Sequence, residues 1–348
     1  MTRLDALWMN RIVGRMTHVL DNQLKEARVE SFLPVNRGNV EKGIRFLLLF
    51  LRESILYGEP AIFLDNVTWY RRNHLIRSFP VFLLGQTLAV FRDVLGQEGD
   101  PAFRSQAVPL VEAAMARLDD AMKDQETYLE QPGVDQAACR VYLDALLSLE
   151  PDPARETVNA MLRRDPDVKR VYSRLFQPVL YETGRLWQTG EISVAQEHYV
   201  TESTRAIMDA ILPSTDRSAD GGQVFLGLCA ENEQHSVGIR MVCDHFALGG
   251  WKSIFLGGNV PAGGVLDVVR RKHVSLVGIS VSMPYNIHTA ADIIRALREA
   301  ADGACPPILV GGIAFNEYPD LWVKVGADAY TSTAEEALAK GLSLIAKA

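Results

Sequence analysis

A short polar segment between two apolar stretches carries the side chains best suited to chemistry in this chain. It reads Glu231-Asn232-Glu233-Gln234-His235-Ser236-Val237-Gly238, after an apolar run at 224–229 and before a helical pattern. A histidine at a strand-to-helix junction can reach a ligand above the carboxyl edge of a sheet. Glu233 can hold the proton on one imidazole nitrogen, which makes the other nitrogen of His235 a better metal donor. Gly238 leaves room for a bulky group against the helix start.

Taken alone, this E-x-H-x-x-G pattern also fits a surface histidine in a polar loop. The spacing to two later landmarks argues against that reading. Residues 239–279 separate Gly238 from Ser280-Val281-Ser282, and residues 283–310 separate that segment from Gly311-Gly312. Both landmarks stand at the end of an apolar run. Their order and separation resemble the D/E-x-H-x-x-G, S-x-L-like and G-G landmarks of the cobalamin-binding domain family.

The resemblance implies a role for each landmark. His235 would replace the cofactor's own benzimidazole as lower axial ligand of cobalt, with Glu233 supporting it. The family's serine and glycines line the slot for the displaced nucleotide tail, which here gives Ser280, Gly311 and Gly312. Ser282 also belongs to this set, although the family commonly has leucine or valine there. Gly257, after the apolar run 253–256, is expected to face the edge of the corrin ring.

A second motif lies upstream, in the segment from Leu186 to His198. It resembles the W-x-x-G-E-x-x-V-A-x-E-H signature of the helical domain that caps cobalamin in methionine synthase-like corrinoid proteins and CarH-type photoreceptors. The resemblance implies that Trp187 excludes water from the upper face and that Glu197 accepts hydrogen bonds from an adenosyl ribose. The alternative is an indole in a bundle core beside ordinary surface groups.

One position in that motif departs from the CarH type. The residue after the tryptophan is Gln188, where CarH-type proteins have a histidine that captures cobalt after photolysis. Glutamine is a poor cobalt ligand. Either His198 takes the upper position after photolysis, or water stays there.

Strand and helix patterns alternate through the last third of the chain. Five apolar runs near 224–229, 253–256, 276–281, 308–310 and 329–330 are each followed by a helical pattern. This alternation predicts a flavodoxin-like (Rossmann-like) α/β domain with a parallel sheet over residues 222–348.

Two helical regions are expected before this sheet. Residues 134–215 contain four helical patterns, near 135–149, 153–163, 167–186 and 193–212, which predict a four-helix-bundle cap. Residues 1–130 predict an all-α domain of four or five helices, with breaks near Pro34 to Gly38, Gly58 to Pro60, Ser78 to Pro80 and Gly96 to Pro101.

The N-terminal region contains one cluster of interest, Trp69-Tyr70-Arg71-Arg72. It is either a core tryptophan beside a solvated basic face or a pocket that holds a flat ligand and clamps its carboxylates. The region loosely resembles globin-like sensory domains and the bilin-associated region of photocobilins. That resemblance implies biliverdin bound without a covalent link, since residues 1–128 contain no cysteine, with Arg45 or Arg52 meeting a second propionate.

Composition excludes several classes of protein. The longest apolar stretch, 46–51, is too short to span a membrane, and the start of the chain lacks the apolar core of a signal peptide, so we expect a cytoplasmic protein. The net charge of −7 and the absence of a dense basic cluster argue against direct binding of nucleic acid. Four scattered cysteines, without C-x-x-C spacing, predict free thiols.

These patterns lead to one function and one alternative. The first is a cobalamin-dependent light sensor, without catalytic residues, that binds adenosylcobalamin and changes conformation or oligomeric state on photolysis. Such a sensor is expected to form a homo-oligomer and to act on a downstream signalling protein. The alternative is a methyl-carrying corrinoid protein of a methyltransferase system. A mutase is disfavoured because no eight-fold strand–helix repeat precedes the cap.

Overall fold

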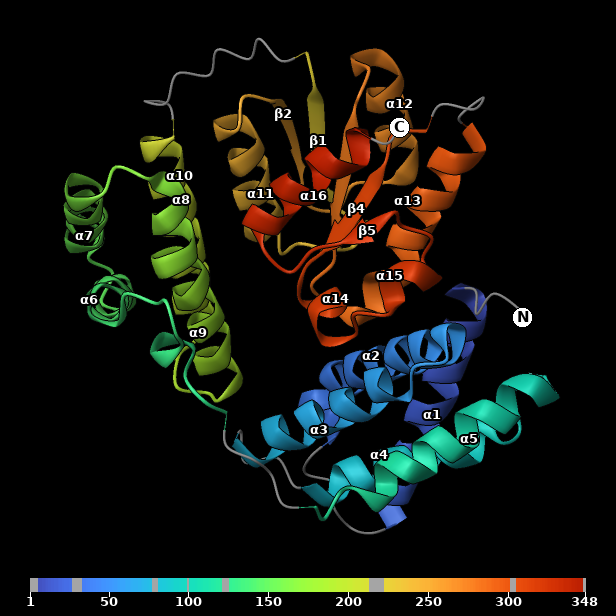
Figure 1. Ribbon diagram of the computed structural model, residues 1–348. Coiled ribbons are helices and arrows are strands. Elements are labelled where there is room, and N and C mark those ends of the chain that lie inside the picture. Colours follow the sequence, from blue (N-terminus) through green and yellow to red (C-terminus); the bar gives the residue numbers. More distant parts are fainter. Residues whose placement is uncertain are drawn as a thin grey trace. The chain divides into compact units, whose positions relative to one another are not determined.

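The computed structural model describes residues 6–26, 33–76, 81–98, 100–120, 125–212, 222–300 and 305–346. The chain divides into two compact units, Met1–Lys123 and Asp124–Ala348 (Figure 1). None of the helices formed by these residues is long and apolar enough to cross a membrane. The predicted division into three domains is finer than this split and stays a prediction.

The N-terminal unit consists of helices in its described part. They are α1 (Ala6–Glu26), α2 (Leu33–Tyr57), α3 (Pro60–Ile76), α4 (Val81–Leu95) and α5 (Pro101–Ala116). The start of α5 shows why a break falls before it. Asp100 caps the helix by accepting from the Phe103 amide at 2.8 Å, and Pro101 occupies the first turn, where it has no hydrogen bond to lose.

Two of the four predicted breaks in this unit are confirmed and one is wrong. One helix ends and the next begins at Gly58 to Pro60 and again at Gly96 to Pro101, as predicted. The break expected at Pro34 to Gly38 is absent, because α2 begins at Leu33 and Pro34 therefore lies in its first turn, where proline is tolerated. The break expected at Ser78 to Pro80 lies outside the described residues.

The second unit begins with a set of helices that we call the helical domain, residues 125–212. Its elements are η2 (Tyr128–Glu130), α6 (Gln136–Leu147), α7 (Pro151–Arg164), α8 (Val168–Val171), the π-helical turn η3 (Tyr172–Phe176), α9 (Gln177–Gln188) and α10 (Val194–Ile211). Since α8, η3 and α9 follow without a break, four helical segments result, close to the predicted positions. Ser193 and Gln196 form the capping box at the start of α10.

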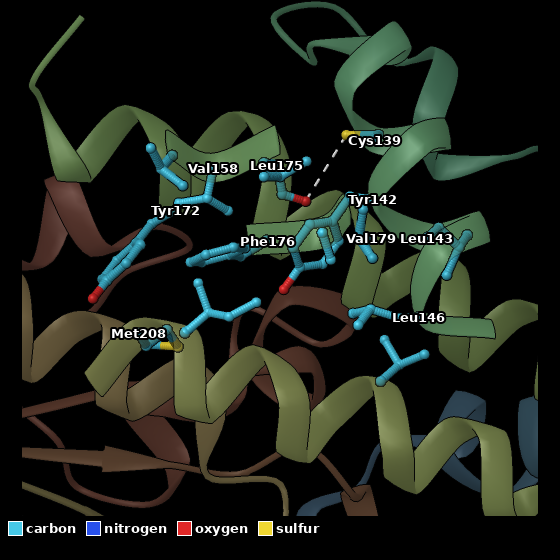
Figure 2. Close-up of a cluster of buried hydrophobic side chains, with 14 of the residues drawn as sticks. Cys139, Tyr142, Leu143, Leu146, Val158, Tyr172, Leu175, Phe176, Val179 and Met208 are labelled. Carbon is cyan, nitrogen blue, oxygen red and sulfur yellow. Dashed lines mark hydrogen bonds between the residues drawn. The ribbon is translucent and has the colours of Figure 1, made fainter. Parts of the chain in front are cut away.

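One hydrophobic core joins these helices (Figure 2). Tyr142 and Tyr172 both pack near Phe176, with ring centroids 5.6 and 5.7 Å away. The two tyrosine hydroxyls are satisfied inside the core, since Tyr142 bonds to Thr204 at 3.0 Å and Tyr172 donates to Asp244 at 2.9 Å. The core continues into the first helix of the α/β domain, because side chains from that helix belong to the same cluster.

The α/β domain contains a five-stranded parallel sheet. Its strands are β1 (Val224–Cys229), β2 (Lys252–Gly257), β3 (Leu276–Ser280), β4 (Ile308–Gly311) and β5 (Ala329–Tyr330), in the spatial order β2-β1-β3-β4-β5. The register pairs Cys229 with Ser280 and Ser280 with Gly311, so these strands end at the same level. The predicted parallel sheet is confirmed.

Helices cover both faces of this sheet (Figure 1). They are α11 (Val237–Leu248), α12 (Ala262–Lys272), η4 (Pro284–Asn286), α13 (Ile287–Ala300), α14 (Ile313–Glu317), α15 (Leu321–Lys324) and α16 (Ala334–Ile345). The chain steps one way from β1 to β2 and the other way from β2 onward, so right-handed crossovers put α11 on one face and α12 and α13 on the other. The reversal lies between β1 and β3, where this kind of fold binds its ligands.

Candidate cobalamin site

The loop after β1 places His235 at this reversal point and fixes its ring through Glu233. The carboxylate oxygen Oε1 of Glu233 lies 2.5 Å from His235 Nδ1 and also accepts the His235 backbone amide at 3.0 Å. The Glu233 side chain is fully buried, while that of His235 is 61% exposed. With Nδ1 bound to the carboxylate, Nε2 is the nitrogen left to face a ligand.

The second oxygen of Glu233 is held by the loop after β3. Oε2 accepts the backbone amides of Ser282 at 2.9 Å and Met283 at 2.8 Å. Burial raises the pKa of Glu233, yet the bonds from His235 and the backbone outweigh it and lower this pKa to about 2. Glu233 therefore stays ionised and ties the two loops of the reversal point together.

Asn286 completes this arrangement and was not identified from the sequence. It is 2% exposed, and its Nδ2 donates to the Asn232 carbonyl at 3.2 Å and lies 3.5 Å from Glu233 Oε2. Asn232 has a left-handed φ of 66°. The buried amide bonds this left-handed residue and so stabilises the conformation of the β1 loop. The sequence offered a weak signal, one polar residue inside the apolar stretch Pro284 to Ile287.

Hydrogen bonding to Glu233 also changes the histidine. The bond to the carboxylate raises the pKa of His235, burial opposes this, and the negative charges of Glu233 and Glu197 add to the rise. The effect of Glu197 is informative, because this residue comes from α10 of the helical domain. A carboxylate of the helical domain thus lies close enough to His235 to act on its charge.

The glycines at the ends of β2 and β4 allow close backbone approach. Gly312 has φ +97°, and a Cβ there would lie 2.5 Å from the Val281 carbonyl and 2.9 Å from Ser280 Oγ. Gly311 lies against the Thr331 carbonyl, where a Cβ would be 3.0 Å away. Ser280, Gly311 and Gly312 therefore lie together, as the sequence predicts, although their role toward a nucleotide tail stays a prediction.

Two further predicted glycines, Gly238 and Gly257, lie where an added Cβ would meet nothing within 4 Å. The glycine next to Gly257 makes the closer contact, because a Cβ on Gly258 would lie 2.8 Å from the Glu233 carbonyl. The following Asn259 amide donates to that same carbonyl at 2.8 Å. The β2 loop is thus joined to the histidine loop.

The residues predicted for the upper face lie on two consecutive helices of the helical domain. Trp187 and Gln188 end α9, and Glu197 and His198 belong to the first turns of α10. Glu197 Oε2 lies 2.6 Å from His198 Nδ1, and Glu197 Oε1 accepts from Thr201 at 3.2 Å. The His198 side chain is 72% exposed. Gln188 Oε1 accepts from Gln125 at 3.4 Å, a contact that the sequence did not indicate.

Comparison with known families matches the same part of the chain. Residues 224–340 match a family model described as B12 binding domain, and residues 138–212 match a second model with the same description. The chain contains a B12-binding domain. Both matches lie within the unit Asp124–Ala348, and they agree with the predicted cobalamin resemblance of the helical domain and the sheet.

Individual relatives of this chain are distant. It is 25% identical to dimethylamine corrinoid protein 1 of Methanosarcina acetivorans over 169 residues, which is 48% of this chain and 76% of that protein. It is 26% identical to the HTH-type transcriptional repressor CarH of Myxococcus xanthus over 159 residues, 46% of this chain and 52% of CarH. The solved structure of Methanosarcina barkeri monomethylamine corrinoid protein matches with a TM-score of 0.53 and 18% identity. That match covers 60% of this chain and 99% of the other, and it shows the fold alone.

The residues present fit a cobalamin. A single imidazole, exposed at one nitrogen and held at the other by an ionised carboxylate, is a donor suited to cobalt. The glycines whose added Cβ would meet nothing, Gly238 and Gly257, leave open space beside the histidine loop. His235 would hold the metal and Glu233 would fix the imidazole.

The cluster predicted to bind a bilin lies in the N-terminal unit. The rings of Trp69 and Tyr70 meet edge to face, with centroids 5.2 Å apart, and Tyr70 packs against α2 at Gly43. Arg71 donates through Nη1 to the Asp120 carbonyl at 2.5 Å. These contacts are internal to the unit.

The other arginines considered for a bilin also have partners. Arg52 pairs with the fully buried Glu53 at 2.8 Å, and Arg45 donates to Asn10 at 2.8 Å. Arg72 is half-buried. Arg52 is therefore paired with a carboxylate, whereas the exposed Arg45 bonds a neutral amide oxygen.

Proposed function

We propose that the chain is a light sensor that binds adenosylcobalamin between its helical domain and the carboxyl edge of its sheet, with His235 as lower axial ligand. When bound, the cofactor supplies a cobalt–carbon bond that light can break. Around it, Glu233 holds the proton of His235 Nδ1 and keeps Nε2 directed at the metal. Ser280, Gly311 and Gly312 provide the close backbone surface on which the nucleotide tail would lie.

The observation that carries this proposal is the position of Glu197. This carboxylate comes from the helical domain, is 29% exposed and acts on the charge of His235. A carboxylate whose charge acts on the imidazole is suited to accept hydrogen bonds from the hydroxyls of an adenosyl ribose, whereas a methyl group offers no donor. Trp187, ten residues earlier, would cover the adenosyl group and exclude water. Gln188 follows Trp187 directly and would therefore also lie at the upper face.

A specific observation favours a second candidate, a methyl-carrying corrinoid protein. Several relatives are named as methylamine corrinoid proteins, and 60% of this chain matches the fold of one such protein over 99% of its length. The relatives are named as corrinoid proteins and a repressor, and in neither candidate is the chain itself an enzyme. The compact unit Met1–Lys123 lies outside the matched residues and favours the sensor, which needs a part that responds to the cofactor.

The deciding experiment is an absorption spectrum of the purified chain loaded with adenosylcobalamin, before and after green light, with its size measured in both states. The sensor should lose the adenosylcobalamin spectrum within minutes and change its oligomeric state or hydrodynamic radius, as expected when contacts with the helical domain are lost. Unchanged size in both states, together with tight binding of methylcobalamin, would favour the methyl carrier.

Biliverdin is not part of this proposal. Arg45, Arg52 and Arg71 each bond to a group of the N-terminal unit, and no contact among the described residues shows them turned toward a common ligand. Expression with a source of biliverdin is the direct check. Red absorbance that disappears when residues 1–128 are removed would show that the N-terminal region binds biliverdin.

A further inference from the structure

The segment that leads out of the N-terminal unit, residues 125–130, is bonded to α9 of the helical domain. Gln125 Nε2 donates to Gln188 Oε1 at 3.4 Å, and the Tyr128 amide donates to Glu182 Oε2 at 2.9 Å. Both acceptors lie on the helix that ends in the predicted upper-face residues. The segment is thus attached to α9 at two points.

A buried ion pair extends this attachment to the loop after α9. Glu182 Oε1 accepts from Arg185 Nε at 3.1 Å and Nη2 at 2.7 Å, and these side chains are 5% and 15% exposed. Arg185 also reaches Glu191 at 3.4 Å, to which Thr189 donates at 2.7 Å. We call Tyr128, Glu182, Arg185, Thr189 and Glu191 the corner clasp.

The charge on Glu182 is stable in this setting. Burial raises the pKa of Glu182, but the bonds from Arg185 and the Tyr128 amide outweigh it and lower the pKa overall. The carboxylate therefore stays ionised and remains a strong acceptor for the connecting segment. The Tyr128 ring adds a contact with Tyr181, with centroids 5.3 Å apart.

The corner clasp spans the positions of Trp187 and Gln188. The contact of Gln188 with Gln125 is long, and Gln188 is half-buried, so a group that engages Gln188 competes with a weak bond. By contrast, Leu129 is 7% exposed and belongs to the core of the helical domain. A shift at the corner must therefore displace residues 125–128, because the next residue is fixed.

We propose that the corner clasp couples the upper face of the cobalamin site to residues 125–128, the segment that follows the N-terminal unit along the chain. A bulky upper group engages Trp187 and Gln188 and loosens residues 125–128, and its loss lets Gln188 bond Gln125 again. This inference rests on the proposed function, because that proposal places Trp187 and Gln188 at the upper face.

Amide hydrogen exchange of residues 125–128 in the full chain tests the coupling. It is measured without cobalamin, with adenosylcobalamin in the dark and with hydroxocobalamin. We expect exchange about tenfold faster with adenosylcobalamin than in the other two states. Gln125→Ala removes the competing bond without leaving a buried group unpaired, and it should exchange at the faster rate in every state while its cobalamin spectrum stays that of the wild type.

Two more variants sharpen the result. Glu182→Gln breaks the clasp itself and should also exchange fast in every state. Glu130→Gln is the matched control, since Glu130 lies in the same segment but pairs only with Arg140 at the surface, both being more than half exposed. This control should keep the wild-type difference between the states.

The outcomes separate the coupling from the proposed function. If wild-type residues 125–128 exchange equally in all three states while the spectrum shows bound cobalamin, the coupling is wrong and the cobalamin site stands. The coupling is also wrong if Glu130→Gln behaves like Gln125→Ala. If the chain shows no cobalamin spectrum at all, the proposed function and this inference are overturned together.

Discussion

Replacing Glu233 by glutamine tests the central feature of the site, a buried carboxylate that joins two loops. The wild-type carboxylate accepts from His235 through one oxygen and from the Ser282 and Met283 amides through the other. In Glu233→Gln one of these oxygens becomes an NH2 group that cannot accept. Donors on that side lose their acceptor inside the protein, which is costly for buried groups.

The size of the effect follows from the pKa of Glu233, which is about 2 against an ordinary 4.5. Because the folded-state pKa is depressed, the stabilisation is present above pH 4.5 and is lost as the pH falls toward 2. At neutral pH it amounts to about 3 kcal/mol. At pH 3.5 most of the unfolded carboxyls are protonated but few folded ones, so roughly 1 kcal/mol of this stabilisation is lost.

Native-state hydrogen exchange of the β1 amides, residues 224–229, measures the stability of the sheet separately from the N-terminal unit. Corrected for intrinsic rates, the wild type should be more stable than Glu233→Gln by about 3 kcal/mol at pH 7, and this difference should be roughly 1 kcal/mol smaller at pH 3.5. Glu130→Gln should show neither difference, because exposed ion pairs contribute little. A difference between wild type and Glu233→Gln that is the same at both pH values would refute the reasoning.

Four other expectations concern the cofactor and the thiols. His235→Ala should remove the spectral features of imidazole bound to cobalt and weaken cobalamin binding by at least about tenfold; an unchanged cobalt spectrum would remove His235 from the site. Trp187→Ala should weaken adenosylcobalamin binding far more than methylcobalamin binding, measured by titration, because only the adenosyl group offers a large face to bury; equal losses would favour the methyl carrier. Burial raises the pKa of Cys139 and of Cys243 to about 12, so at pH 8 a thiol reagent should modify the half-buried Cys305 first and the three buried cysteines only on unfolding. Since these pKa values are raised in the folded state, stability should hold up to about pH 9 and fall toward pH 12, as a pH series of unfolding curves would show.

Local patterns predicted the elements that carry the site. Apolar runs followed by helical periodicity gave all five strands to within two residues, and the position of His235 after the first run fixed it at the sheet edge. The spacing of Ser280 and Gly312 predicted that these residues lie close together, and they do. The prediction is wrong at Pro34, because this proline occupies the first turn of α2, where it does not interrupt the helix.

Contacts between distant residues were beyond the sequence. Nothing near Asn286 reveals that its amide reaches Asn232, 54 positions earlier. Likewise, Glu182 looks like a surface residue of a helix until Arg185 and the Tyr128 amide are found around it. A buried polar group is recognised by its partners, and those are set by the tertiary fold.

The sharing of α11 between the two hydrophobic layers limits how the molecule can open. Val237 and Met241 stand directly after the histidine loop, yet both belong to the core of the helical domain. Lifting that domain away from the sheet would expose both, at about 3–5 kcal/mol. It would also break the bond between Arg240 and Asp209. A spontaneously open form would then be present in fewer than about one molecule in a hundred. A partner enzyme that needs direct access to cobalt would have to supply binding energy to open the molecule. Light, by contrast, can reach a bound cofactor in the closed form.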